Sequence, residues 1–359
     1  MLSFRYPRFP GVTSEIQAQI FRCVRSWIVA GEVNIVEFAE SPLFSFSFQA
    51  LRSDPLFEDA VDVICDVIHE TQEVDDYMAV IERIVVQLLE LRSAVSATHD
   101  DAEKVRGYCR IFTEAGETYR LLILNHPETF FPIVETIAEC AAYPDLDIVQ
   151  ITFNFWYRLA QSIGKRPSVA TQFQELYKGL MDVMIGHLHF PPDSEPLTAQ
   201  ERDDFRAFRH VMGDTLKDCC YVLGTAACLK AAYDKVALAV SQPSPSWQEI
   251  EAPLFSMRSM GAEVDPNDDK VVPLIMDMIP KLPNHPQVRY AATLVICRYT
   301  EWVDLHPQYI EYQLAYISTG FESPDTQVSA AAGQAMKYLS KDCKRVSTRV
   351  HTDVEHIWI

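Results

Sequence analysis

The sequence predicts an all-α protein, an α-solenoid (superhelix) built from antiparallel helix pairs. Two segments of nearly the same pattern carry this prediction: HPQVRYAA begins at His285, and DTQVSAAA begins 40 residues later at Asp325. In both segments small residues share one helical face, and larger apolar residues follow three or four positions further on. Such a face lets a neighbouring helix approach closely.

An offset of 40 residues lies in the range of HEAT and armadillo repeats. A related copy begins at Asp145, 140 residues before His285, so the period extends beyond one duplicated pair. A solenoid has no single core and grows by adding layers, which favours one long array over several globular domains. We therefore expect about eight HEAT repeats in a single solenoid over residues 13–359, preceded by an irregular leader at residues 1–12.

The first predicted helix follows Thr13, which can cap its N-terminus, and ends near Gly31. Its apolar residues are expected on one face: Ile16, Ile20, Val24, Trp27 and Ile28.

Phe44, Phe46 and Phe48 then alternate with serines, which taken alone is typical of a strand. A helix also fits, because Phe44, Phe48 and Leu51 recur at i, i+4 and i+7 after a Ser41-Pro42 start. We prefer the helix, since an isolated strand would have no partner in this sequence.

Apolar periodicity predicts the next helices in turn. One begins after Asp54-Pro55, its partner covers about residues 78–89, a long helix runs over about 101–125, and a shorter one follows at 130–142. The copy at Asp145 leads into an aromatic helix that carries Phe153, Phe155, Trp156 and Tyr157. We assign this stripe to the core between repeats and not to a ligand cage.

In the C-terminal half, a helix over residues 170–188 precedes the proline-rich loop 190–197, which we expect to vary most in length. Thr198 and Glu201 form a capping-box signal for a long helix that stops at Gly224. Residues 243–246 separate the next unit, which Asp265-Pro266 divides into two helices. After the two copies described above, apolar residues from Asp353 onward predict the start of a further helix.

Lys and Arg total 31 against 50 for Asp and Glu, which gives a net charge of −19. This charge disfavours DNA, RNA and anionic membrane surfaces as partners. A basic protein partner fits this negative charge, although an acidic composition can also serve solubility alone.

The sequence also bears on where the protein resides. The nine cysteines form no CxxC pair, and the chain has no secretory signal and no apolar run long enough to cross a bilayer. We therefore expect a cytosolic or nuclear protein.

The sequence contains none of the common catalytic or nucleotide-binding motifs. It has no phosphate-binding GxGxxG or GxxxxGK[ST] motif, and no GxSxG, HExxH or EF-hand pattern. His187 and His189 form the closest histidine pair, but a spacing of i, i+2 at a helix end does not direct both rings at one metal. We expect no enzymatic activity, no metal and no cofactor.

The strongest candidate for a contact with a partner protein is the charged segment at residues 201–218. Its candidate contact residues are Glu201, Asp203, Asp204, Arg206, Arg209, Asp214 and Asp218. The functional interpretation is a surface for a basic partner, with Phe205 and Phe208 on the opposite side of the helix. The alternative is a solvated face whose charges pair internally, such as Asp203 with Arg206.

Four segments occur in the order and spacing of a known family: YCRIFTE from Tyr108, ITFNFWYRL from Ile151, DDFRAFR from Asp203 and VRYAA from Val288. They resemble the karyopherin-beta (importin-beta) superfamily, and in particular its transportin-SR branch of nuclear import receptors. The resemblance covers nearly all of the chain from about Ile16 onward. It corresponds to the middle of a receptor, roughly the fifth to the twelfth HEAT repeats.

The resemblance implies a receptor that shuttles between cytoplasm and nucleus through the nuclear pore. It implies Ran GTPase, FG nucleoporins and basic cargo such as SR/RG-rich RNA-binding proteins as partners, and we expect a monomer. Relative to a full receptor the chain looks truncated at both ends, without the repeats that grip Ran or read a phosphorylated cargo domain. The alternative is a truncated HEAT-repeat scaffold or regulatory interaction module without transport activity of its own.

Overall fold

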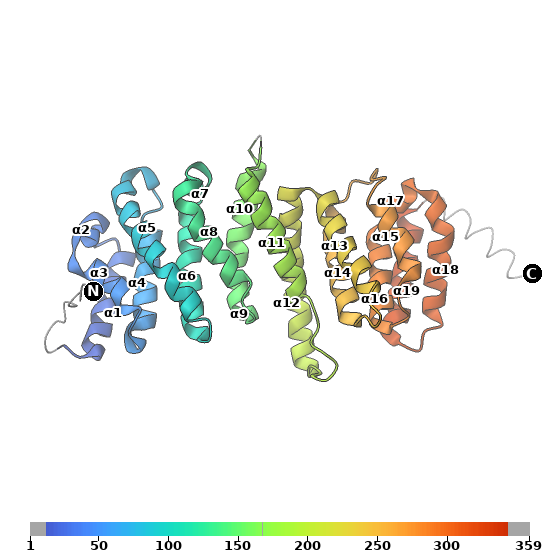
Figure 1. The fold of residues 1–359 in the computed structure, drawn as a ribbon, viewed down its shortest axis with the longest axis horizontal. Helices are drawn as coiled ribbons and strands as arrows, with labels where there is room; N and C mark the ends of the chain where they lie inside the picture. Colours follow the sequence, from blue (N-terminus) through green and yellow to red (C-terminus); the bar gives the residue numbers. More distant parts are fainter. Residues whose placement is uncertain (1–11, 167, 344–359) are drawn as a thin grey trace, which may run out of the picture. The chain divides into compact units, whose positions relative to one another are not determined.

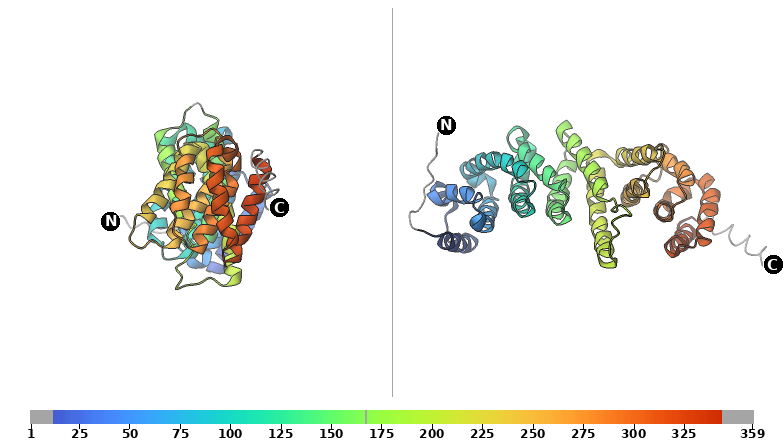
Figure 2. Two further views of the ribbon diagram at one scale, coloured as in Figure 1. Left: turned by 90° about the vertical axis from the view of Figure 1, so that its right-hand side faces the viewer. Right: turned by 60° about the horizontal axis from the view of Figure 1, so that its bottom comes forward.

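The computed structural model describes residues 12–166 and 168–343. Every regular element in these two stretches is a helix, which confirms the predicted all-α class (Figure 1), and Figure 2 shows the same from two further directions. Contacts divide the chain into two compact units, Met1–Leu159 and Ala160–Ile359, which we describe one at a time. Residues 1–11 of the predicted leader and the helix predicted from Asp353 lie outside the described residues.

In the first unit, α1, α4 and α6 lie side by side in one layer, and α3, α5 and α8 pack against them as a second layer (Figure 1). The α-helices of this unit are α1 (Ser14–Val29), α2 (Ile35–Glu40), α3 (Pro42–Ala50), α4 (Phe57–His69), α5 (Val74–Ala97), α6 (Ala102–Thr118), α7 (Arg120–Asn125), α8 (Pro127–Ala141), α9 (Leu146–Val149) and α10 (Phe153–Gly164), the last of which crosses the boundary between the units. Short 3-10 turns precede α4 (Asp54–Leu56) and α10 (Gln150–Thr152).

In the second unit, α12, α14, α16 and α19 contact one another in succession, and α11, α13 and α18 each pack on a member of this row. The α-helices of this unit are α11 (Thr171–His187), α12 (Ala199–Leu223), α13 (Thr225–Val240), α14 (Trp247–Met260), α15 (Val272–Met278), α16 (Pro286–Arg298), α17 (Thr300–Leu305), α18 (Ile310–Phe321) and α19 (Thr326–Asp342). The two helices predicted on either side of Asp265-Pro266 are therefore α14 and α15.

Capping residues set several helix ends where the sequence predicts them. Thr13 accepts a hydrogen bond from the backbone N–H of Ile16 at the start of α1. Thr198 and Glu201 form the predicted capping box of α12, and Gly224, at a φ of 86°, ends that helix. Ser41 and Pro42 begin α3, and this confirms the helical interpretation of the Phe44 to Phe48 segment.

The single helix predicted over residues 101–125 is wrong, because the chain breaks at Tyr119 into α6 and α7. Tyr119 is fully buried, and its hydroxyl lies 2.7 Å from the hydroxyl of Thr71. The Thr71 hydroxyl donates to the carbonyl of Ile68, so Tyr119 is the donor to Thr71. Burial and this hydrogen bond hold the ring in the core, and the backbone leaves helical geometry at the same residue.

The apolar face predicted for α1 is also partly wrong. Val24 and Ile28 are buried as expected, but Ile16, Ile20 and Trp27 are 51%, 37% and 56% exposed. The helix packs on α4 and on the turn that precedes it, and the buried side is completed by Ala18 and Phe21. Because these contacts lie on one side of α1, a broad apolar stripe is only half covered.

The two copies of the repeat motif lie on α16 and α19, which pack against each other. Val288, Ala291, Ala292 and their counterparts Val328, Ala331 and Ala332 are all buried. A β-carbon added at Gly320 of α18 would lie 2.9 Å from the β-carbon of Ala332, which is closer than side chains normally pack. The predicted close approach at small residues is confirmed.

Polar contacts between neighbouring helices reproduce the period seen in the sequence. Tyr299 donates to the carbonyl of Met257, and Thr300 donates to Asp342, and each of these pairs is separated by 42 residues. The spacing of helices along the chain is thus also the spacing of the side chains that join them.

We expect Ala332→Leu to destabilise the chain by about 1–3 kcal/mol, because added methylenes overpack the contact with α18. The measurement is urea or thermal unfolding followed by circular dichroism. Ala330→Leu is the matched control, since Ala330 is exposed on the same helix, and it should stay within about 0.5 kcal/mol of the parent. Equal losses in the two variants would contradict the assigned packing.

Candidate functional site

The predicted contact segment lies on α12 in the second unit, where Glu201 serves first as a cap. One carboxylate oxygen of Glu201 accepts from the backbone N–H of Thr198 at 2.8 Å and from its hydroxyl at 2.8 Å. The backbone hydrogen bond, followed by the side-chain one, lowers the pKa of Glu201. Glu201 is exposed, but part of its hydrogen-bonding capacity is already used within the chain.

Most other candidate residues are exposed and pair within their own helix. Arg206 lies 3.5 Å from Asp203, as predicted, and Lys217 lies 2.8 Å from Asp214. Asp204 accepts a hydrogen bond from Gln200 at 2.8 Å. Exposed pairs of this kind contribute little, about 0–1 kcal/mol, so they can exchange for contacts with a partner at small cost.

Arg209 requires a correction, because the structure places it in the interior and not on the contact surface. Its guanidinium donates twice to Glu251 of α14, at 3.1 and 2.6 Å. Arg209 is 3% exposed and Glu251 is 4% exposed. A buried guanidinium is strongly destabilising without a carboxylate partner. Glu251, one repeat further along the chain, is that partner for Arg209.

Aromatic rings enclose this ion pair. The guanidinium carbon of Arg209 lies 4.1 Å from the ring centre of Phe255 and 4.6 Å from that of Phe190. Phe190 belongs to the loop that we expected to vary most. Two contacts with Trp247 of α14 hold this loop in place. Trp247 donates to the carboxylate of Asp193 at 3.0 Å, and Phe190 packs on the Trp247 ring.

Asp218 differs from the other acidic residues of α12. Burial, and secondarily the charge of Asp214, raise its pKa to about 7. Asp218 is partly buried in the structure. It therefore changes charge near neutral pH, whereas Asp203 and Asp214 lie on the exposed surface of the same helix.

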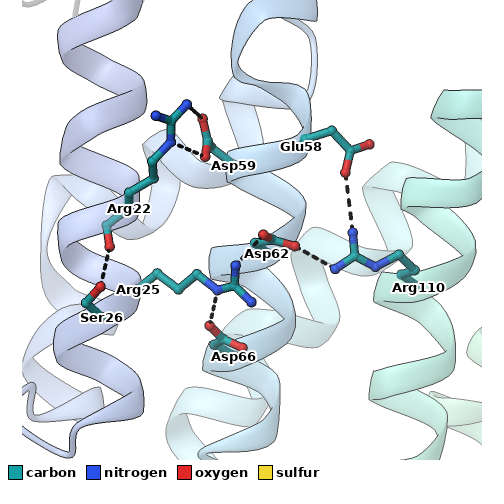
Figure 3. A network of polar contacts seen from close by, with 8 residues as sticks. All are labelled: Arg22, Arg25, Ser26, Glu58, Asp59, Asp62, Asp66 and Arg110. Carbon is teal, nitrogen blue, oxygen red and sulfur yellow. Dashed lines mark hydrogen bonds and ion pairs between the residues drawn. The ribbon is translucent and has the colours of Figure 1, made fainter.

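A second charged site, in the first unit, was not predicted. Figure 3 shows Asp62 of α4 between two arginines, Arg25 of α1 and Arg110 of α6, and it pairs with both. Arg25 also reaches Asp66 at 2.9 Å, and Arg22 binds Asp59 through two hydrogen bonds of 2.9 and 3.2 Å. The hydrogen bond to Asp66 is the largest of the effects that act on Arg25, whose pKa is raised. This network joins three successive helices of one layer.

The sequence does contain a signal for this network. Glu58, Asp62 and Asp66 recur every four residues and therefore form one acidic stripe on α4. Arg22 and Arg25 are separated by three residues on α1. The stripes are visible in the sequence, but which helix faces which stripe depends on the packing.

Within the described residues, no group of three or more His, Cys, Asp or Glu side chains is arranged to hold a metal ion, and no helix is long and apolar enough to cross a membrane. Burial raises the pKa of the Cys65, Cys297 and Cys343 thiols to about 12, so these thiols are protonated at neutral pH. Cys23 is exposed.

Comparisons with known proteins bear on this arrangement. Residues 100–187 match a family model described as the Transportin-3/Importin-13 second TPR domain, and residues 269–355 match the third TPR domain of the same description. The mRNA transport regulator MTR10 of Saccharomyces cerevisiae is 33% identical over 356 residues, which cover 91% of this chain and 36% of MTR10. The chain belongs to the karyopherin-beta superfamily.

Solved structures agree with this fold assignment. A structure of importin-13 in its cytosolic state superimposes with a TM-score of 0.70 at 17% identity, over 93% of this karyopherin-beta chain and 40% of the other. A structure of Kap95p, whose binding induces the switch loops of RanGDP to adopt the GTP-bound conformation, gives a TM-score of 0.59 at 13% identity, over 82% and 35% of the two chains. The α-solenoid class is confirmed. The chain spans about a third of the length of the curated relatives that it matches.

We expect Arg209→Met to cost about 3–5 kcal/mol of unfolding free energy, because Glu251 would remain buried without a partner. The double variant, Arg209→Met with Glu251→Leu, should lose less than Arg209→Met alone, since no buried charge is left. Urea unfolding measures both. Arg206→Met, at a partly exposed position of the same helix, is the control, and a single-variant loss no larger than that of this control would contradict the assignment.

The raised pKa of Asp218 predicts a pH dependence. The folded chain binds this proton more tightly than the unfolded chain, whose carboxyl has an ordinary pKa near 3.8. The group therefore lowers stability progressively as the pH rises from about 4 to about 7. Asp218→Asn should remove this loss and stabilise the chain at about pH 8 relative to about pH 5, by an amount on the order of 1–2 kcal/mol after allowance for partial solvation.

Unfolding curves at several pH values test this expectation. Asp214→Asn should shift the titration of Asp218 to lower pH, because it removes a neighbouring negative charge. Asp204→Asn, at an exposed position, should leave the pH profile unchanged. A profile for Asp218→Asn that parallels the parent would overturn the assignment.

Proposed function

We propose that this chain is part of a nuclear import receptor that carries basic protein cargo, such as SR/RG-rich RNA-binding proteins, under the control of Ran-GTP. The observation that carries the proposal is the pair of matches to successive Transportin-3/Importin-13 domains. Such a receptor acts by binding and release, and the arrangement of the site is suited to that. Its localisation would be the cytoplasm and the nucleus, with FG nucleoporins as contacts during passage.

The surface proposed for the basic partner is the exposed acidic part of α12. Asp203 and Asp214 are 11 residues apart, which is three helical turns, so they lie on the same side of the helix. Their local partners, Arg206 and Lys217, are themselves partly exposed. A lysine- or arginine-rich segment can therefore replace weak internal pairs with contacts of the same kind.

A binding experiment tests this proposal on the intact chain. An immobilised SR/RG-rich peptide should retain the chain at low salt, where the attraction between opposite charges is least screened. Asp203→Lys combined with Asp214→Lys should weaken peptide retention about tenfold or more, which corresponds to ~1.4 kcal/mol. The matched control reverses Glu175 and Asp234 to lysine on α11 and α13, and it should bind as the parent does.

Two outcomes would contradict the proposal. If the chain neither binds the peptide nor shifts on a native gel with Ran-GTP, the transport function fails for this chain and the alternative, a HEAT-repeat scaffold without transport activity, takes its place. If the chain binds but the α12 reversals and the control lose affinity equally, the contact surface lies elsewhere.

A further inference from the structure

A groove runs over the row α12, α14, α16 and α19 of the second unit. It consists of three adjoining depressions of about 410, 90 and 470 Å³. The first and the central one share Phe190, Arg206, Gln287 and Gln327, and the central and the third share Arg258 and Leu294. We call the whole the α12–α19 groove.

The centre of this groove is basic in an otherwise acidic protein. Arg206, Arg209 and Arg258 line the central depression together with His210, and Glu251 is its one acidic residue. Both oxygens of Glu251 are bound to Arg209, so no carboxylate there is left for the other two arginines. Against a net charge of −19 for the whole chain, this is a local reversal of sign.

Arg258 is a cation that lines both the central and the third depression. Among the described residues it forms no ion pair with a carboxylate, and its guanidinium carbon lies 6.0 Å from the ring centre of Phe255. It is partly exposed and stands at the junction of the central and third depressions. A ligand in the groove can therefore reach it from either side.

Two neighbouring groups report the same electropositive environment. The buried Nε of Arg209 has no hydrogen-bond acceptor within the part of the chain that the structure describes. Burial, followed by the charges of Arg258 and Arg209, lowers the pKa of His210. The unsatisfied N–H shows that an acceptor is lacking beside Arg209, and the contributions of Arg258 and Arg209 to the His210 shift are those expected of neighbouring positive charges.

The carboxylates of the first depression are also committed to the fold. Asp193 accepts from Trp247 and from Gln248, at 3.0 and 3.3 Å. Asp325 caps α19 by accepting from the backbone N–H groups of Gln327 and Val328. The first depression thus offers Arg202 and Arg206 beside the aromatic ring of Trp247, and one oxygen of each of its two carboxylates is already engaged.

We propose that the α12–α19 groove binds an acidic peptide segment of a partner protein, with one carboxylate of that segment paired to Arg258 and the segment extending towards Arg206. Charge complementarity identifies the partner, since a Glu- or Asp-rich segment supplies the acceptors that the central depression lacks. The apolar rings of Phe190 and Trp247 give the segment surface to pack on. This site is distinct from the exposed acidic part of α12, and the proposal does not rest on a transport function.

The test uses the full chain and a fluorescein-labelled peptide in which Glu alternates with Ser. Fluorescence anisotropy should show binding at low salt that is lost near ~1 M salt, where screening shortens the range of the interaction to about 3 Å. A peptide of equal length with Lys in place of Glu should not bind the groove. Its affinity should be unchanged by Arg258→Glu.

Arg258→Glu should weaken binding of the acidic peptide about tenfold or more, and Arg258→Lys should weaken it less. Lys230→Glu makes the same change of charge on α13, outside the groove, and should leave the affinity within about twofold of the parent. Circular dichroism of each variant establishes that it folds. If Arg258→Glu does not fold, the comparison of Arg258→Lys with the parent still tests the site.

Three results would overturn the proposal. The first is an equal loss of affinity for the Glu and Lys peptides in Arg258→Glu, and the second is an equal loss of affinity for the Glu peptide in Arg258→Glu and Lys230→Glu. The third is displacement of the acidic peptide by oligouridylate at equal charge concentration, because the groove would then bind polyanions, including RNA, without preference. None of these results depends on Ran or on an SR/RG-rich cargo, so the proposed function stands or falls separately.

Discussion

Each helix pair of this chain has an apolar face that only the next pair can cover, and the rest of the structure depends on that constraint. Where neighbouring helices meet, the contact often falls on a residue without a side chain. A β-carbon at Gly116 of α6 would lie 2.6 Å from Ile137 and 2.8 Å from Phe155, and one at Gly107 would overlap the ring of Phe57. Stability in such an array is a sum of neighbour contacts.

The same constraint determines how charge is used. Because neighbouring helices are one repeat apart, ion pairs between them join residues a repeat apart, as Arg209 and Glu251 do in the interior. Asp62 connects two neighbours at once on the surface. The two surfaces proposed for partners differ from these pairs: the acidic residues of α12 form only weak exposed pairs within their own helix, and Arg258 in the α12–α19 groove has no carboxylate partner among the described residues.

The sequence was sufficient to predict the features of the fold that depend on residues close together along the chain. The period, the capping box at Thr198 and the stop at Gly224 follow from residues a few positions apart. Contacts over a full repeat were not accessible in this way: Arg209 has acidic neighbours on its own helix, yet it pairs 42 residues away. The break at Tyr119 likewise depends on a hydroxyl 48 residues away, and the exposed side of α1 depends on which neighbours are present.

Hydrogen exchange measured by mass spectrometry on Gly116→Val tests the central claim most directly. If stability is built from neighbour contacts, protection should fall in α6, α8 and α10, which meet at Gly116, while α1 keeps the protection of the parent chain. A uniform loss of protection throughout the first unit would show a single cooperative core and would contradict the account.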